Sequence, residues 1–271
     1  MNLFGTDYSR PGRGITPEEA KKRSYFGILF RKFTKISQAS LVFSLCNILF
    51  LAALVFYVLM AVLYGYKGEA QDIENYMLAI LGGKQLLPIY IFIPFVLMGH
   101  GTVGLTYITR NFSQQKHAFV WSDFWEYTKK YLWKGLLLSF IITALYYFYF
   151  TAFVFYMNSG INKLFVMILE INIGLFLTMI SFYVYPLMIT FDIKIGSILK
   201  YACILAIGNY PKNLLVIIAL LLVHGLMIFY ALPLWVILMP VFLFGWSSYT
   251  INYVATGAIN KILLKKEQSE I

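Results

Sequence analysis

Three ionisable side chains interrupt long apolar runs of the sequence: His100, Glu170 and His224. Ionisable groups are unfavourable in lipid and therefore often mark an ion or substrate path. Two imidazoles and a carboxylate could relay protons or bind a metal ion. Each could also be structural, because a neutral histidine can hydrogen-bond to a neighbouring helix and Glu170 can pair with Lys163. The sequence offers these three residues as a candidate intramembrane polar site, with buried structural roles as the simpler interpretation.

The motifs of familiar catalytic centres are absent from the sequence. It contains no CxxC, HExxH, Gly-x-Ser-x-Gly or Walker A segment. Gly99, Gly101 and Gly104 match the spacing of a dinucleotide-binding loop, but they lie in an apolar run, where small residues let helices approach closely. Two cysteines, Cys46 and Cys203, are too few for a disulfide framework and are expected to be reduced. We therefore expect a protein that is not an enzyme, with no catalytic, cofactor-binding or metal-binding residues.

Composition identifies the environment that must position these residues. The chain has 271 residues, of which 60% are hydrophobic and only 13% are charged, and its mean hydropathy is +0.73. Soluble domains carry about 25% charged residues, so a soluble enzyme and a disordered chain are both excluded. Apolar runs of more than about 18 residues recur, which is typical of membrane-spanning helices. The predicted fold class is an all-α integral membrane protein.

Six segments are long enough to cross a bilayer, which takes about 20 residues of helix. Prolines inside three of these segments are expected to kink their helices. They are Pro88 and Pro94 in the second, Pro186 in the fourth and Pro240 in the sixth. The predicted spans are Ser40–Tyr64, Leu86–Ile108, Gly135–Met157, Leu164–Ile189, Asn213–Leu232 and Leu234–Val254.

The distribution of basic residues predicts the orientation of these spans. Of the 22 Lys and Arg residues, 19 fall before the first span, in two of the loops, or after the last span, and the opposite side holds Lys67, Lys84 and Lys163. Basic residues favour the cytoplasmic side, so both termini are predicted to be cytoplasmic in a multi-pass protein of the cell membrane. The net charge of +10 then reflects topology and contact with membrane lipids, with no nucleic acid as partner. The predicted regions are a basic N-terminal segment with an amphipathic helix (1–39), a six-helix membrane domain (40–256) and a basic tail (257–271).

Short amphipathic helices are predicted on the cytoplasmic side, before the first, third and fifth spans. In the third of them Ile198, Ala202 and Leu205 share one face. Such helices typically lie in the membrane interface. The order suggests a unit of one interfacial helix and two spans that occurs three times. The alternative is that these are ordinary anchoring helices of a multi-pass protein without a repeat.

The second of these helices, predicted over Ser122–Trp133, is the candidate docking surface. Ser122 is placed to cap its start. Its apolar face is expected to enter the headgroup region or a groove of a neighbouring protein, while its lysines meet anionic lipid. The residues of this candidate docking surface are Trp121, Phe124, Trp125, Lys129 and Lys130. A simple anchoring role is the alternative.

Tyrosines crowd the third and fourth predicted spans, among them Tyr146, Tyr149, Tyr183 and Tyr185. A phenol in the middle of a membrane needs a hydrogen-bond partner. These side chains are therefore expected to face other helices or a polar cavity, which could contact a sugar or a lipid headgroup.

Five segments of the sequence carry a resemblance to a known family: the opening "NLFGTDYSRPGRGI", "FRKFTK" before the first predicted span, "GLTYITRNFSQQKHAFVWSDFWEYTKKYLWKG" over Gly104–Gly135, "YPKNLLVI" over Tyr210–Ile217 and "INYV" from Ile251. In these segments, and over essentially its whole length, the sequence resembles the YesL-like membrane proteins of Gram-positive bacteria. This resemblance implies a six-span protein whose biochemical role is not established and whose relatives are often encoded beside oligosaccharide importers.

The resemblance implies an accessory subunit of a carbohydrate ABC importer, with the permease subunits as partners. The chain has no nucleotide-binding domain and no clear EAA loop for docking an ATPase, which favours a companion of the permease pair. The alternative is a proton-coupled secondary transporter of a small polar solute that uses His100, Glu170 and His224.

Overall fold

The computed structural model describes residues 24–48, 51–52, 87–191 and 193–269. Within these residues the chain forms helices and no strands. The elements, in chain order, are α2 (Tyr25–Arg31), α3 (Phe33–Cys46), α6 (Leu87–Ser113), α7 (Val120–Lys130), α8 (Leu132–Met157), α9 (Lys163–Thr190), α10 (Ile195–Gly208), α11 (Tyr210–Tyr230), α12 (Leu232–Leu238), the π-helical segment η1 (Met239–Leu243) and α13 (Phe244–Ser269).

Four helical segments in the described part of the chain are long and apolar enough to cross a membrane. They are α8, α9, α11 and the continuous segment Leu232–Lys261, which contains α12, η1 and most of α13. They correspond to the third, fourth, fifth and sixth predicted spans and identify an all-α membrane protein. The second predicted span, Leu86–Ile108, overlaps α6, which continues to Ser113. Much of the first predicted span, Ser40–Tyr64, lies outside the described residues.

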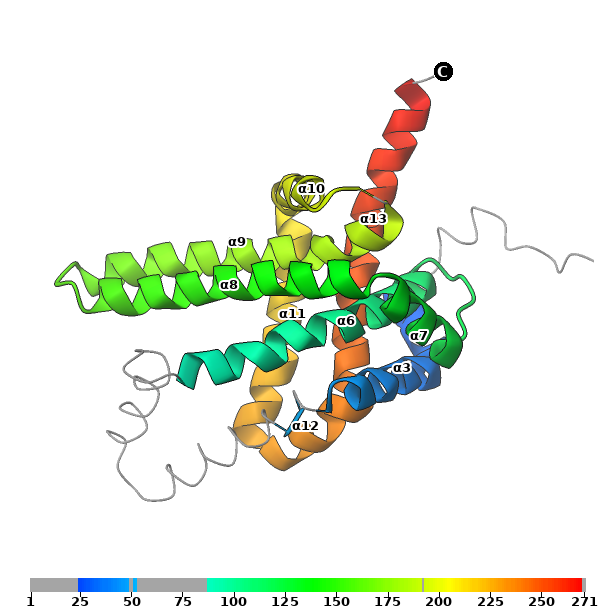
Figure 1. Ribbon diagram of the computed structural model, residues 1–271, viewed down its shortest axis with the longest axis horizontal. Coiled ribbons are helices and arrows are strands. Elements are labelled where there is room, and N and C mark those ends of the chain that lie inside the picture. The colour runs from blue at the N-terminus through cyan, green and yellow to red at the C-terminus, as the bar shows by residue number, and fades with distance from the viewer. Residues whose placement is uncertain (1–23, 49–50, 53–86, 192, 270–271) are drawn as a thin grey trace, which may run out of the picture.

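The long helices do not form one parallel bundle. Figure 1 shows α8 and α9 side by side as an antiparallel hairpin, whereas α11 and α13 run across them. The short helices α7 and α10 precede α8 and α11, so the second and third predicted units of one short helix followed by two long segments are present in this order. Both predicted region boundaries fall inside helices, because α3 continues through residues 39–40 and α13 through residues 256–257.

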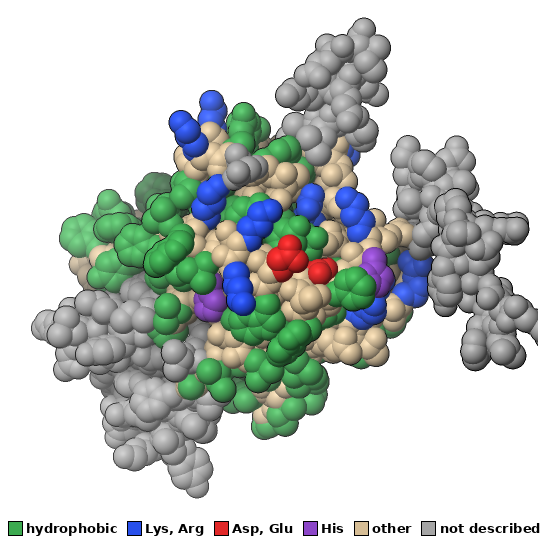
Figure 2. Space-filling model, turned by 45° about the vertical axis from the view of Figure 1, so that its right-hand side comes forward, with side chains coloured by type: hydrophobic (Ala, Val, Ile, Leu, Met, Phe, Trp, Pro, Cys, Tyr) green, Lys and Arg blue, Asp and Glu red, His purple; other side chains and the backbone are tan. Residues whose placement is uncertain are grey.

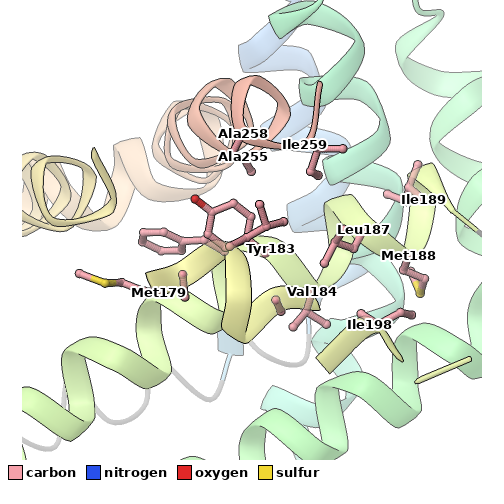
Figure 3. Close-up of a cluster of buried hydrophobic side chains, with 14 of the residues drawn as sticks. Met179, Tyr183, Val184, Leu187, Met188, Ile189, Ile198, Ala255, Ala258 and Ile259 are labelled. Carbon is pink, nitrogen blue, oxygen red and sulfur yellow. The ribbon is translucent and has the colours of Figure 1, made fainter. Parts of the chain in front are cut away.

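One hydrophobic core lies where the second half of α9 meets α10, α11 and the second half of α13. Figure 3 shows Met179, Tyr183, Val184 and Leu187 of α9 grouped with Ile198 of α10 and with residues of α13. The Tyr183 hydroxyl donates to Asn213 Oδ1 at 2.7 Å, and Asn213 Nδ2 donates to the Ala206 carbonyl at 3.1 Å. These two bonds join α9, α11 and α10 inside the core.

A second core joins α3, α6, α7 and α13. Phe43, Phe112, Phe124 and Tyr249 are fully buried in it. The Tyr249 hydroxyl donates to the Tyr25 carbonyl at 3.0 Å, which fastens α2 to α13. Short helices therefore cover both cores.

Glycines on α6 allow the closest helix contacts. A Cβ at Gly99 would collide with the Ser139 side chain of α8, and one at Gly104 would lie 2.7 Å from the Phe124 carbonyl of α7. This confirms the interpretation of Gly99 and Gly104 as packing positions. Pro240 lies in the π-helical segment that interrupts the last predicted span, whereas Pro94 and Pro186 lie inside α6 and α9.

A row of hydroxyl and amide groups joins α6 to α13. Thr109 Oγ1 lies 2.9 Å from Ser248 Oγ and accepts from Asn252 Nδ2 at 3.0 Å. One turn further along, Ser113 Oγ lies 3.3 Å from Thr256 Oγ1. We call these five residues the α6–α13 ladder. Polar groups of this kind hold helices together in membranes, where apolar side chains gain little by leaving lipid.

Candidate functional site

His100 on α6 contacts the end of α3. Its Nδ1 atom is hydrogen-bonded to the Leu97 carbonyl, so Nδ1 carries the proton in the neutral ring. The Nε2 atom is then an acceptor, and the Cys46 thiol donates to it over 3.1 Å. Both nitrogens of His100 therefore have partners within α3 and α6.

His224 on α11 is hydrogen-bonded to residues of both α12 and α13. The Trp235 indole N–H, which can only donate, reaches His224 Nδ1 at 3.0 Å. The proton of the neutral imidazole consequently lies on Nε2, which donates to Ser247 Oγ at 3.0 Å. This arrangement gives His224 a structural task, since one ring joins three helical elements.

Glu170 lies on α9, next to Tyr149 of α8. The residue is 3% exposed, and its Oε2 atom has no hydrogen-bond partner in the described part of the structure. The neighbouring Tyr149 hydroxyl donates to the Glu170 backbone carbonyl at 3.0 Å, not to the carboxylate. Lys163 lies on the exposed surface, and no ion pair with Glu170 is formed among the described residues.

The structure does not bring the three predicted residues together. His100 contacts Cys46, His224 contacts Trp235 and Ser247, and Glu170 packs near Tyr149, so each lies at a different helix junction. Within the described residues there is no group of three His, Cys, Asp or Glu side chains that could hold a metal ion. A relay or metal site shared by the three residues, which the sequence left open, is therefore not assembled, and the separate surroundings agree with buried structural roles. Spacing along the chain could not show this, because the helices cross at angles that hydropathy does not encode.

A cavity of about 590 Å³ lies among α3, α6, α8, α9 and α13. Its wall combines aromatic rings with hydroxyl groups, including Tyr146, Tyr185, Ser139 and Thr143. Two of the four tyrosines singled out above therefore face a cavity, while Tyr149 and Tyr183 bond to other helices. None of the described residues that line the cavity carries a charge.

The cavity meets one end of the α6–α13 ladder at Ser248 and Asn252. The ladder was missed at the sequence level, although it has a signal there. Residues with a hydroxyl or amide side chain recur every three or four positions within the apolar runs, which places them on one helix face. The two series are Thr102, Thr106, Thr109 and Ser113 on α6, and Ser248, Asn252 and Thr256 on α13.

The candidate docking surface is only partly exposed. Trp121 is 61% exposed, Lys129 and Lys130 are also exposed, and Trp125 is half-buried. Phe124 is fully buried against α6 and the second core. Its assignment to an exposed docking surface was wrong, because α7 uses this side chain to pack on its own chain.

The start of α7 also differs from the prediction. The helix begins at Val120, and the Asp123 carboxylate accepts a hydrogen bond from the Phe119 backbone N–H at 2.9 Å. Ser122 lies inside the helix and does not cap it. At the other end, Tyr131 separates α7 from α8, so Trp133 belongs to α8.

A tyrosine stack fixes α7 on α6. The Tyr107 and Tyr127 rings are stacked with their centroids 3.4 Å apart, and Lys130 Nζ lies 5.6 Å from the Tyr127 ring centroid. The hydrogen bond with Tyr107, together with burial, raises the pKa of the Tyr127 phenol above its ordinary value. The stack holds the exposed face of α7 in a fixed direction.

Comparison of the chain with known protein families, curated proteins and solved structures gave no match.

Proposed function

We propose that this protein is a non-catalytic accessory subunit that associates with the permease subunits of a carbohydrate or oligosaccharide ABC importer. The support is the sequence resemblance over Gly104–Gly135, which covers α7 and its two junctions, together with the surface that this segment presents. The proposal places the chain in the cell membrane with six spans and both termini in the cytoplasm.

The observation that carries the proposal is the exposure of two tryptophans, Trp121 in the first turn of α7 and Trp133 in the first turn of α8. Trp121 is 61% exposed and Trp133 is 81% exposed, although both helices pack against the rest of the protein. Exposed tryptophans beside basic residues are typical of binding hot spots and of interfacial anchors. Lys129 and Lys130 supply the basic residues here. We define Trp121, Trp133, Lys129 and Lys130 as the α7–α8 surface.

The alternative, a proton-coupled transporter, would need groups that pass a proton between them. His100 and His224 each have local hydrogen-bond partners that satisfy both ring nitrogens. Glu170 is part of a third junction. These separate surroundings favour the accessory role over a relay through the three residues.

The number of basic residues and their positions in the structure support the proposed orientation of the chain in the membrane. Figure 2 shows Lys and Arg side chains gathered over the face that carries α7, around a small acidic patch. The second span of the proposed topology is α6. In a chain with Cys46→Ser and Cys203→Ser, a cysteine placed at Asn75 should react with an impermeant maleimide on intact cells, and one placed at Lys116 should not. The reverse labelling would refute the topology.

Co-purification tests the function. The full chain, extracted in a mild detergent from cells with the importer genes, should retain the permease subunits, and its deletion should reduce oligosaccharide uptake. The double variant Trp121→Ala with Trp133→Ala should lose most of the recovered permease. Phe148→Ala with Phe155→Ala is the matched control, because these aromatic residues of α8 are also exposed but lie away from the α7–α8 surface.

Two outcomes would contradict the proposal. Uptake by the purified protein alone in liposomes, driven by a pH gradient, would establish the transporter instead. If the double tryptophan variant still recovers the same amount of permease, the α7–α8 surface serves only to anchor the protein in lipid.

A further inference from the structure

The cavity among α3, α6, α8, α9 and α13 opens on the side of α6 and α8. The exposed residues of its wall all belong to these two helices and are Phe95, Tyr147, Phe150 and Thr151. Other lining residues are buried, since Phe43 of α3 is 1% exposed and Phe182 of α9 is 7% exposed. The cavity therefore extends from the protein surface into the interior.

The opening lies at a depth where the surroundings are lipid. The helix α8 is long and apolar enough to cross a membrane, and residues Tyr147–Thr151 lie well inside its range of Leu132–Met157. The hydrocarbon core of a bilayer takes about 20 residues of helix to cross. The open side of the cavity is therefore in contact with the acyl chains of the bilayer.

The hydroxyl groups of the wall are largely engaged within the protein. Four of them donate to backbone carbonyls of α6, α8 or α9 over no more than 2.9 Å, and they belong to Thr102, Ser139, Thr151 and Ser181. A fifth, that of Tyr146, lies 3.0 Å from Thr178 Oγ1. None of the described lining residues is charged, so a phosphate headgroup would lose its hydration here without compensation. The wall is therefore suited to an apolar occupant.

The aromatic part of the wall offers such an occupant extensive contact. Phe43, Phe95, Phe150 and Phe182 contribute rings from four different helices. The volume of about 590 Å³ lies within the range of about 300–1,000 Å³ that is usual for small-molecule sites. An empty cavity of this kind would forgo the dispersion contacts of its lining atoms, and an acyl chain at the opening can supply them.

We infer that this cavity holds one acyl chain of a bilayer phospholipid, which enters from the side of α6 and α8 while the headgroup stays outside. The site is independent of the α7–α8 surface and of the proposed association with an importer.

Photolabelling from the lipid tests the inference. The full chain is placed in nanodiscs of phosphatidylcholine that contains some lipid with a diazirine in the middle of one acyl chain. After irradiation, mass spectrometry should find adducts on Ser181 of α9 and Ile251 of α13, which line the cavity and are half-buried. Leu221 of α11 is 66% exposed and should be labelled in every sample. Labelling of Leu221 without Ser181 and Ile251 would overturn the inference.

The position of the headgroup is tested on the same unmodified protein. Phosphatidylcholine that carries the diazirine on its headgroup should give no adducts on Ser181 or Ile251, because only the acyl chain enters. Adducts from this second lipid on either residue would contradict the inferred orientation. This comparison needs no variant, so it does not depend on how a substitution affects folding.

Two substitutions locate the site. Thr143→Phe places a ring in the cavity and should abolish acyl-chain labelling of Ser181 and Ile251 while labelling of Leu221 persists. Leu145→Phe is the matched control, because Leu145 lies on the same helix, does not line the cavity and is 42% exposed; it should leave all labelling unchanged. Undiminished labelling in Thr143→Phe would show that the acyl chain reaches these residues by another route and would refute the site.

Discussion

The two halves of α9 have similar composition and opposite surroundings. Leu164, Phe165 and Ile171 in the first half are exposed, whereas Met179 and Tyr183 in the second half are fully buried. The helix is apolar enough to span a membrane, so hydropathy does not separate its halves. What separates them is the presence of neighbours, because α10, α11 and α13 cover only the second half. Apolar character places a helix in lipid, and specific contacts decide which part packs on protein.

The largest expected difference between the two regions is in the free energy of unfolding. Tyr183→Ala removes a fully buried ring and the bond to Asn213, and it should destabilise the protein by about 3–5 kcal/mol. Phe165→Ala, in the exposed half of the same helix, should change stability by less than about 1 kcal/mol. Chemical unfolding in mixed micelles, followed by circular dichroism, measures both. Similar losses for the two variants would break the comparison.

The next largest change in stability is expected where α6 and α7 pack closely at Gly104. Gly104→Val would push a side chain into the α7 backbone and the Thr128 side chain, and it should destabilise by about 1–3 kcal/mol. Gly225 on α11 has open space around it, so Gly225→Ala should instead stabilise by up to about 1 kcal/mol through helix propensity. Thermal unfolding of the two variants should therefore shift in opposite directions.

The α6–α13 ladder predicts a smaller effect. Thr109→Val removes the hydroxyl that bonds to Ser248 and Asn252, with an expected loss of about 0.6–1.7 kcal/mol. Thr151→Val is the control, because among the described residues that exposed hydroxyl bonds only to the Tyr147 carbonyl of its own helix. A stability change in the control equal to that of Thr109→Val would show that the ladder adds nothing between helices.

The smallest expected effect appears at alkaline pH. The pKa of Tyr127 is raised in the folded protein, first by its hydrogen bond with Tyr107 and then by burial. The stability that this phenol contributes is therefore complete below its ordinary pKa of about 10 and is lost as pH rises through the folded pKa. In the Tyr127→Phe variant, the free energy of unfolding should therefore fall less steeply above about pH 10. Phenolate absorbance during the titration should show one tyrosine fewer, and an unchanged decline would exclude Tyr127 as its source.

The sequence predicted the long helices well because their signal is local. Four of the six predicted spans match helices that can cross a membrane, and α7 and α10 lie where amphipathic patterns indicate them. The direction of their apolar faces was not predictable in the same way. Phe124 and Ile198 are buried against the chain's own helices, since an amphipathic pattern is the same whether its apolar side meets lipid or protein.

The candidate site was the least predictable part. His100 and His224 were identified as unusual, and their partners Cys46 and Trp235 come from other helices. Which helices meet depends on crossing directions that a single sequence does not specify. The α6–α13 ladder was accessible in principle, because its spacing follows one helix face, and a search for periodic hydroxyls within apolar runs would have found it.

The π-helical segment at Met239–Leu243 changes the direction in which the side chains before it point relative to the side chains after it. Trp235 and Ser247 both bond to His224, although residues 12 positions apart on an uninterrupted α-helix point about 120° away from each other. A π-helical turn takes roughly one residue more than an α-helical turn, so five residues of it remove about 100° of rotation. The π-helical segment thus offsets most of the difference of about 120°, so that Trp235 and Ser247 point toward the same side of the helix. Deleting a single residue there would rotate α12 out of alignment with α13 and release the indole from the imidazole.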